Sequence, residues 1–187
     1  MYFDIPAVGL APYLTLLGIT LLAAALPMLL ARKKSLKANL RNGATAGALV
    51  LPVTLLLGMG VTSNSLIVQD GQVQVRASYF YEYARDIAEF DLARARHGSY
   101  ASIAPARIGL RDNGIQLPGY AAGRFTAEDR QPLFVALTST DKVVYLPARK
   151  GQSLLVSVDD AEHLLETLHR RAALDRAAAP LRLSSKD

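Results

Sequence analysis

The sequence predicts a two-helix transmembrane hairpin followed by an α+β domain. Two long uncharged apolar runs lie in the first third of the chain, and five cations are concentrated in the short segment between them. After the second run, the pattern changes to short alternating segments and then to one amphipathic helix. The 187-residue chain is 51% hydrophobic, with a mean hydropathy of +0.19 and a net charge of +5.

The two apolar runs are long enough to cross a membrane as helices. In the first, Tyr13 carries the only ionisable side chain, and residues 43–61 have none. A helix rises about 1.5 Å per residue, so about 20 residues cross the roughly 30 Å of hydrocarbon. Pro27 and Pro52 fall inside the runs, where membrane helices tolerate proline better than soluble ones. We therefore predict an N-terminal tail at residues 1–9 and transmembrane helices at 10–31 and 43–63.

Other interpretations of these runs have less support. A secretory signal peptide carries its basic residues before the apolar run, whereas here Asp4 precedes it and the cations follow it. Transporters and channels usually place charged residues or histidine within their spans, and these spans contain none. Gly43 and Gly47 form a small-xxx-small pair, which we expect to pack the hairpin rather than a partner chain.

The segment at residues 32–42 predicts the orientation of the hairpin. Its cations are Arg32, Lys33, Lys34, Lys37 and Arg41. Short loops rich in Lys and Arg stay in the cytoplasm, so we expect the N-terminus and the C-terminal domain to be extracytoplasmic. The same cations could contact anionic lipid headgroups, at about 1 kcal/mol each.

The charge distribution also restricts the partners. Residues 64–187 have a net charge of only +1, whereas a nucleic-acid-binding domain spreads basic residues over its folded surface. We therefore expect the lipid bilayer, and no nucleic acid, as a partner. The absence of cysteine excludes disulfides, a thiolate nucleophile and cysteine-based metal sites.

Residues 65–174 are predicted to form the α+β domain. Asp70-Gly71 is a hairpin turn, and further strands are expected near residues 133–137, 143–146 and 154–156, as a meander or small barrel. Tyr79, Tyr81 and Tyr83 alternate along a predicted strand. We interpret them as cross-strand packing, with a binding face or a membrane-interface position as the alternatives.

One helix closes the domain. Asp159 is its expected N-cap, with Glu162 three residues later. An apolar stripe follows at helical spacing, formed by Ala161, Leu164, Leu165, Leu168 and Ala172. Residues 175–187 are predicted to be a flexible tail.

Three blocks of the second half, residues 118–125, 143–147 and 151–157, resemble the bacterial pleckstrin-homology-like (PH-like) domain family. The resemblance covers residues 65–171 and is most specific within 117–168. It implies a bent sheet folded as a partly open barrel, capped by the C-terminal helix. Its motif residues are Pro118, Gly119, Tyr120, Gly123 and Phe125. We interpret them as structural, because Pro and Gly set a tight turn that Tyr anchors.

The resemblance does not extend to phosphoinositide binding, because no Lys/Arg cluster lies in the Asp70-Gly71 turn. Nor does it imply catalytic residues. His163 and His169 are six residues apart, on different helix faces, and therefore do not form a metal pair. Ser153 and Ser157 lack a nucleophile elbow. We predict no catalytic, cofactor or metal site.

These observations predict a two-pass protein of the bacterial inner membrane that displays a noncatalytic PH-like binding or assembly module. Its partner would be an unknown protein or a second copy of itself. The alternative is an enzyme, or an accessory subunit of one, that acts on envelope lipid or glycan. Such an enzyme would need residues such as Asp86, Asp91 or His97 in a pocket.

Overall fold

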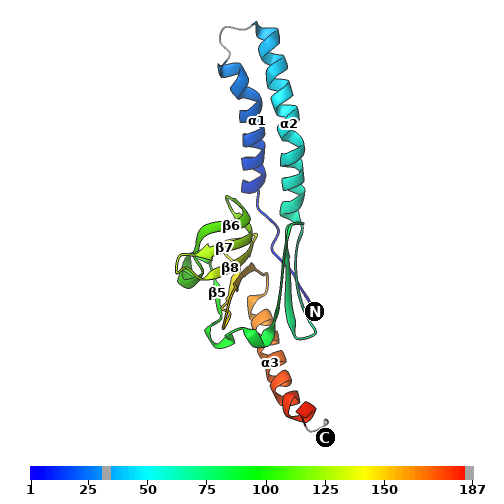
Figure 1. Cartoon of the computed structure of the whole chain (residues 1–187), viewed down its shortest axis with the longest axis vertical. Helices are drawn as coiled ribbons and strands as arrows, with labels where there is room; N and C mark the ends of the chain where they lie inside the picture. Colours follow the sequence, from blue (N-terminus) through cyan, green and yellow to red (C-terminus); the bar gives the residue numbers. More distant parts are fainter. Residues whose placement is uncertain (31–34, 184–187) are drawn as a thin grey trace.

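The structure is a computed structural model that describes residues 1–30 and 35–183. Two long helices, α1 (Ala11–Leu30) and α2 (Leu36–Thr62), stand side by side as an antiparallel hairpin (Figure 1). A domain of two sheets lies at one end of the hairpin, and a third helix, α3 (Ala161–Leu183), leads away on the far side of the domain. The predicted helix hairpin followed by an α+β domain is therefore present.

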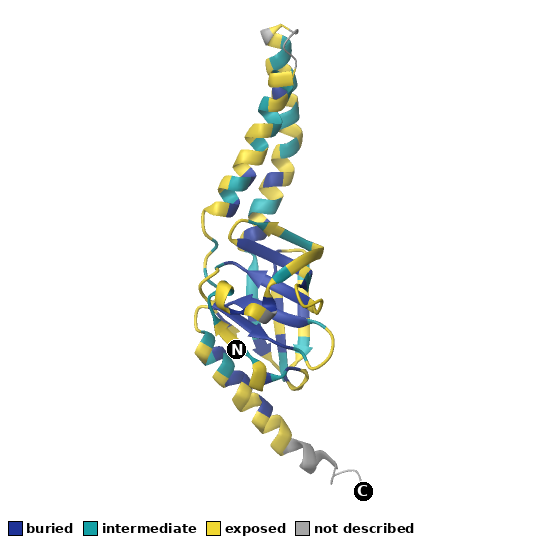
Figure 2. Cartoon of the chain, turned by 90° about the vertical axis from the view of Figure 1, so that its left-hand side faces the viewer, coloured by how far each residue is buried: buried dark blue, intermediate teal, exposed yellow. Residues whose placement is uncertain are grey.

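Both hairpin helices are long and apolar enough to cross a membrane, and both expose most of their surface. Their most apolar 18-residue windows are only 6% and 11% buried. A core helix of a soluble protein would be mostly buried. Figure 2 shows exposed residues along both helices, in contrast to the buried strands of the domain. The apolar surface of the hairpin therefore faces its surroundings and not a protein core.

Helix α2 begins earlier than expected. Its N-cap is Ser35, whose Oγ accepts a hydrogen bond of 3.4 Å from the amide of Ala38. The helix then continues through Lys37 and Arg41, because these are good helix formers and no proline interrupts the segment. Two of the five cations thus lie on the first turns of α2, and not in a loop. Arg32, Lys33 and Lys34 lie outside the described residues.

Small residues form the contact between α1 and α2. A Cβ atom on Gly43 would lie 2.6 Å from the carbonyl oxygen of Ala24, and one on Gly47 would lie 3.4 Å from the Ala24 Cβ. Thr20 Oγ1 and Thr54 Oγ1 are joined across the interface by a hydrogen bond of 3.1 Å. The small-xxx-small pair therefore packs the hairpin, as predicted.

The N-terminal residues belong to the domain, whereas the sequence predicted a tail. Strand β1 (Tyr2–Phe3) pairs antiparallel with β2 (Asn64–Gln69), and the Phe3 side chain is buried. The carbonyl of Asp4 accepts a hydrogen bond of 3.0 Å from the amide of Asp159. A two-residue strand is too short to show periodicity, which is why the pattern missed it. Cleavage after α1 would remove this strand, which argues further against a signal peptide.

The first sheet is antiparallel, with the order β1-β2-β3-β4, where β3 is Gln72–Ala77 and β4 is Tyr81–Asp86. Asp70 and Gly71 have φ values of 51° and 74°, so they form the two-residue turn that was predicted. The tyrosine series is divided between two environments. Tyr83 faces the core and packs on Phe134, with ring centroids 5.0 Å apart, whereas Tyr79 lies in the β3–β4 turn and is exposed.

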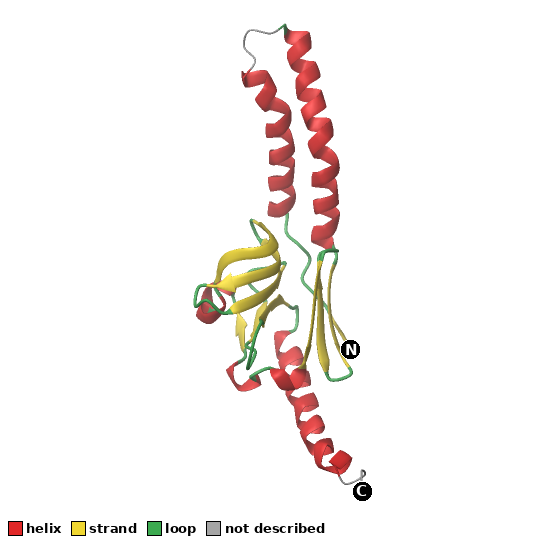
Figure 3. Ribbon diagram, in the orientation of Figure 1, coloured by secondary structure: helices red, strands yellow, loops and turns green. Residues whose placement is uncertain are grey.

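The second sheet has the order β5-β9-β10-β8-β7-β6. Its strands are β5 (Arg96–Gly98), β6 (Ile108–Leu117), β7 (Tyr120–Ala127), β8 (Pro132–Leu137), β9 (Val143–Leu146) and β10 (Ser153–Ser157). Strands β6, β7 and β8 form a meander, in which β6 was not predicted as a strand. The predicted strand β10 lies between β8 and β9 and runs parallel to β8. The prediction of a simple meander is therefore wrong for β8–β10. The two sheets remain separate and form no closed barrel (Figure 3).

Two apolar cores hold the domain together. The larger lies between the two sheets and α3, from which Leu164, Leu168 and Ala172 are buried. It also includes residues from the connection after β4, which contains the 3-10 turns η1 (Ile87–Glu89) and η2 (Leu92–Arg94). The smaller core lies on the other side of the second sheet, beneath the 3-10 turns η3 (Tyr100–Ser102) and η4 (Ala104–Ala106).

Helix α3 differs from its prediction at both ends. Asp160, rather than Asp159, caps the helix, because its Oδ1 accepts a hydrogen bond of 2.9 Å from the amide of His163. The Asp159 carboxylate instead pairs with Lys142, at 2.6 Å. The helix continues to Leu183, through most of the predicted flexible tail, and residues 184–187 lie outside the described part.

Candidate functional site

The region that connects the hairpin to the domain, here called the junction, is built around Asn64, the first residue of β2. Its Nδ2 donates a hydrogen bond of 2.6 Å to the carbonyl of Val61, in the last turn of α2. Its Oδ1 accepts bonds from the Ser78 amide, at 3.2 Å, and from the Tyr120 hydroxyl, at 3.4 Å. One side chain thus connects α2, the β3–β4 turn and the start of β7.

Helix α2 packs directly on the β3–β4 turn. Ser78 is fully buried and has a left-handed backbone, with φ 63°. A Cβ atom on Gly60 would lie 2.6 Å from Ser78 Oγ and 3.6 Å from the ring of Phe80. Only glycine allows this close approach. The hairpin and the first sheet therefore meet through a packed contact as well as through the continuous chain.

Two tyrosine hydroxyls are buried in the domain. Burial raises the pKa of Tyr120 and of Tyr83 far above the ordinary value for tyrosine. The Tyr83 hydroxyl donates a hydrogen bond of 2.9 Å to the carbonyl of Gln152. Both side chains are therefore neutral hydrogen-bond donors with structural roles.

The raised pKa values predict an alkaline limit to the stability of the domain. The folded state binds the tyrosine protons more tightly than the unfolded state, so their contribution is complete below the ordinary pKa of about 10 and is lost progressively above it. We expect the free energy of unfolding to fall above that pH, in denaturant titrations followed by circular dichroism. The Tyr83→Phe/Tyr120→Phe variant should show a shallower fall. An equally steep fall in the variant would contradict this assignment.

The five motif residues lie in the β6–β7 hairpin. Pro118 and Gly119 form the turn, with Gly119 at φ 75°, and Tyr120 is 2% exposed. Gly123 has φ 119°, and a Cβ atom there would lie 2.5 Å from the Asn113 carbonyl oxygen. The Phe125 ring is fully buried in the smaller core.

Hollows lie on both the hairpin and the domain. A mostly apolar groove of about 460 Å³ runs between α1 and α2, with Thr20, Thr54 and Gly58 among its lining residues. A smaller hollow of about 350 Å³ lies on the first sheet, where Arg76 and Glu82 form an ion pair of 2.7 Å. Because both side chains are exposed, this pair contributes less than about 1 kcal/mol.

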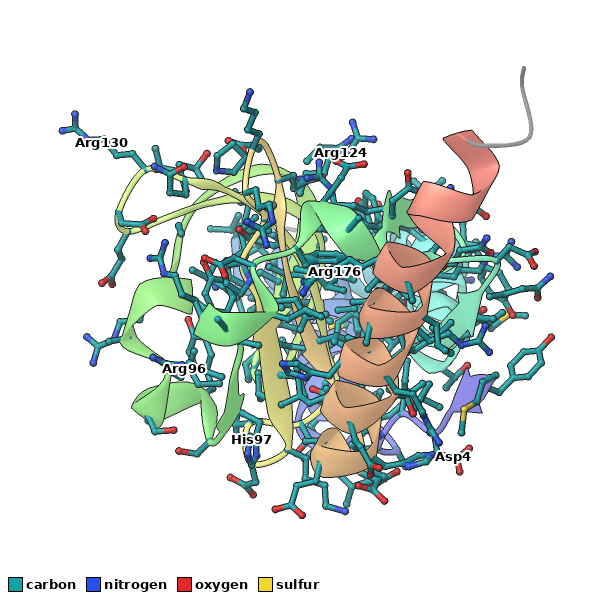
Figure 4. The ribbon with its side chains drawn as sticks, turned by 90° about the horizontal axis from the view of Figure 1, so that it is seen from below. Asp4, Arg96, His97, Arg124, Arg130 and Arg176 are labelled. Carbon is teal, nitrogen blue, oxygen red and sulfur yellow. The ribbon has the colours of Figure 1, made fainter. Side chains whose placement is uncertain are left out.

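A third, polar hollow of about 290 Å³ lies at the start of α3, beside His97, Asp141 and Glu162. The described residues contain no group of three or more His, Cys, Asp or Glu that could hold a metal ion. Figure 4 shows His97 and Asp4 on opposite sides of the first turns of α3, and Arg124 and Arg130 pointing outward elsewhere. These side chains do not converge on one point.

The serines considered as nucleophiles take part in backbone contacts. Ser157 Oγ accepts hydrogen bonds from the amides of Thr138 and Ser139, at 3.0 and 3.1 Å, and donates one to the Ser139 carbonyl. Ser153 Oγ accepts a bond of 3.0 Å from the amide of Ala148. Neither hydroxyl is positioned by a base, so both stabilise loops.

The carboxylates and histidines considered for chemistry also lie apart. Asp86 accepts a hydrogen bond from Gln72, and Glu89 pairs with Arg85 at 3.3 Å. The ring of His163 packs on Phe3, and His169 Nδ1 contacts the carbonyl of Leu165 at 2.8 Å. The structure brings none of these groups together as a pair suited to acid–base chemistry.

The junction was not found from the sequence. Asn64 and Tyr120 are 56 residues apart, and neither segment contains a pattern that indicates their contact. The cations Lys37 and Arg41 lie at the other end of the hairpin, far from the domain (Figure 1). Comparisons of the chain with protein-family models, curated proteins and solved structures found no match.

Proposed function

We propose that the protein is a two-pass protein of the bacterial inner membrane whose helix hairpin anchors a noncatalytic binding or assembly module outside the cytoplasm. One arrangement carries this proposal. An apolar hairpin with a mostly exposed surface has cations at one end and a folded domain at the other. A soluble protein would not leave this much apolar surface in water.

The orientation follows from the two ends of the hairpin. Lys37 and Arg41 lie at the connecting end, which the positive-inside rule places in the cytoplasm. Strand β1 precedes α1 but pairs with β2, which follows α2. The N-terminal residues and the domain therefore share one side of the membrane, and we assign that side to the outside of the cytoplasm.

We propose the bacterial PH-like family for the domain. The motif at residues 118–125 supports this assignment through the turn at Gly119 and the buried anchors Tyr120 and Phe125. The C-terminal helix, which packs against the sheets after the last strand, supports it further. The two sheets remain separate and do not form a barrel, so the family assignment rests mainly on the motif at residues 118–125.

The noncatalytic role is supported by what the candidate side chains do. Ser153, Ser157 and Asp160 satisfy backbone groups, and the two buried tyrosines are neutral donors. A module of this kind acts by binding, and we propose an unidentified protein or a second copy of the chain as its partner.

Fusions test the orientation. Alkaline phosphatase is active only outside the cytoplasm, whereas green fluorescent protein exported unfolded through the general secretion system does not fluoresce there. We expect a C-terminal phosphatase fusion to be active and the matching fluorescent fusion to be dark. Fusions placed after Ser35, between the two spans, should give the reverse pair of results. An inactive C-terminal phosphatase together with a bright fluorescent fusion would overturn the orientation.

A further inference from the structure

The positions of the charges on α2 fix how deep the hairpin can lie in a bilayer. Lys37 and Arg41 are costly within hydrocarbon, so the membrane-embedded part of α2 begins after Arg41. About 20 helical residues then cross about 30 Å, which brings the hydrocarbon boundary to the end of α2 at Thr62. The matching boundary on α1 lies near Ala11, since the 20 residues of α1 have the same length.

The β3–β4 turn lies at the depth of this boundary. A Cβ atom on Gly60 would lie 3.6 Å from the Phe80 ring, and Gly60 precedes the end of α2 by two residues, or about 3 Å. The side chains of Tyr79 and Phe80 are 58% and 52% exposed. Two adjacent aromatic rings are thus uncovered at the level where hydrocarbon meets the headgroups.

The chain around this turn carries no charge. Residues 5–13, 62–69, 77–81 and 113–123 contain no Asp, Glu, Lys or Arg. The nearest charges on the two strands beside the turn, Arg76 and Glu82, pair with each other. Aromatic side chains are enriched at membrane interfaces, where their rings lie among the headgroups. An uncharged end with exposed aromatics that adjoins two spans fits this environment.

We propose that the turn formed by Ser78, Tyr79 and Phe80 inserts into the interfacial layer of the bilayer that the helices cross. The domain is then docked on lipid, and does not swing on its connections to the helices. The left-handed φ of Ser78 belongs to the turn that reverses the chain between β3 and β4, and the packed contact with Gly60 holds this turn at the end of α2. The proposal rests on the proposed function, because it requires α1 and α2 to span the membrane.

The chain contains no tryptophan, so a single introduced tryptophan gives an unambiguous fluorescence signal. Four variants form the test: Phe80→Trp and Tyr79→Trp in the turn, Leu22→Trp at the middle of α1, and Tyr2→Trp. Tyr2 is 79% exposed and pairs with Ile67, well along β2 from the membrane end. Each full-length protein is reconstituted in phosphatidylcholine–phosphatidylglycerol vesicles that contain lipids brominated at a shallow or a deep acyl position.

We expect Phe80→Trp and Tyr79→Trp to emit at shorter wavelength than Tyr2→Trp and to be quenched several-fold more by the shallow bromines. Leu22→Trp should be quenched most by the deep bromines. Quenching of Leu22→Trp without quenching of either turn variant would overturn the insertion and leave the spans intact. Absence of quenching in Leu22→Trp would overturn the spans, and the insertion with them. Using two turn variants keeps the test valid if one of them fails to fold.

Discussion

Alanine at position 123 should destabilise the domain by about 3 kcal/mol or more. The φ of 119° belongs to a region that side chains with a Cβ rarely adopt, which costs of the order of 1–3 kcal/mol. The added Cβ would also lie 2.5 Å from the Asn113 carbonyl oxygen and 2.6 Å from Gly114 Cα, both on the neighbouring strand. Such overpacking typically costs a further 1–3 kcal/mol. Denaturant unfolding of the full chain in detergent, followed by circular dichroism, measures the change.

Gly119→Ala is the matched control for this variant. Gly119 lies in the same hairpin and also has a positive φ, of 75°, but no atom lies within 4 Å of the position that its Cβ would take. Gly119→Ala should lower the free energy of unfolding by only about 1 kcal/mol, which is the cost of the left-handed backbone for a residue with a Cβ. An equal loss of stability in the two alanine variants would contradict the close packing of β6 against β7 at Gly123.

The Gly43→Leu substitution should separate helices α1 and α2. The first added atom would lie 2.6 Å from the Ala24 carbonyl oxygen and 2.9 Å from the end of Met28, so the helices would have to move apart or rotate. Helix pairs in membranes depend on close packing, since lipid competes for apolar contacts. Gly18→Leu adds the same side chain to α1, where nothing lies within 4 Å, and should leave the hairpin unchanged.

A disulfide can report this change, because the chain has no cysteine of its own. The Ala24 Cβ and a Cβ on Gly47 would lie 3.4 Å apart, close to the roughly 3.5–4.5 Å of a disulfide. The Ala24→Cys/Gly47→Cys pair should therefore crosslink under mild oxidation, as measured by altered gel mobility. Adding Gly18→Leu should preserve the crosslink, and adding Gly43→Leu should abolish it. Full crosslinking in the Gly43→Leu background would contradict the interface.

Features encoded by neighbouring residues could be predicted from the sequence. The two apolar runs identified α1 and α2, and Asp70-Gly71 identified the β2–β3 turn, because each depends on local composition or local backbone conformation. The alternating tyrosines predicted a strand that includes Tyr79. In the structure, Tyr79 lies in the turn that begins at Ser78, and the strand begins only at Tyr81. The pattern reports side-chain alternation and does not show where a strand begins.

Pairing between distant segments could not be predicted. An alternating segment shows which residues face the core, but it does not specify its neighbour, so the insertion of β10 between β8 and β9 left no sign in the sequence. The junction could not be predicted for the same reason. The β2–β3 pairing brings Asn64 to Ser78, and Tyr120 joins them only after the two sheets have packed together.

The pairing of β1 with β2 has a consequence for how the chain is assembled. The first strand is synthesised before both helices, whereas its partner begins at Asn64, after the hairpin is complete. If α1 and α2 span a membrane as proposed, the edge of this sheet can close only when both segments have reached the same side of the bilayer. A chain inserted with one helix in place and the other outside would leave β2 without its edge partner and Phe3 unburied. If the helices span a membrane as proposed, folding of the domain would distinguish a chain with both helices inserted from a chain with only one, because only the former brings β1 to β2.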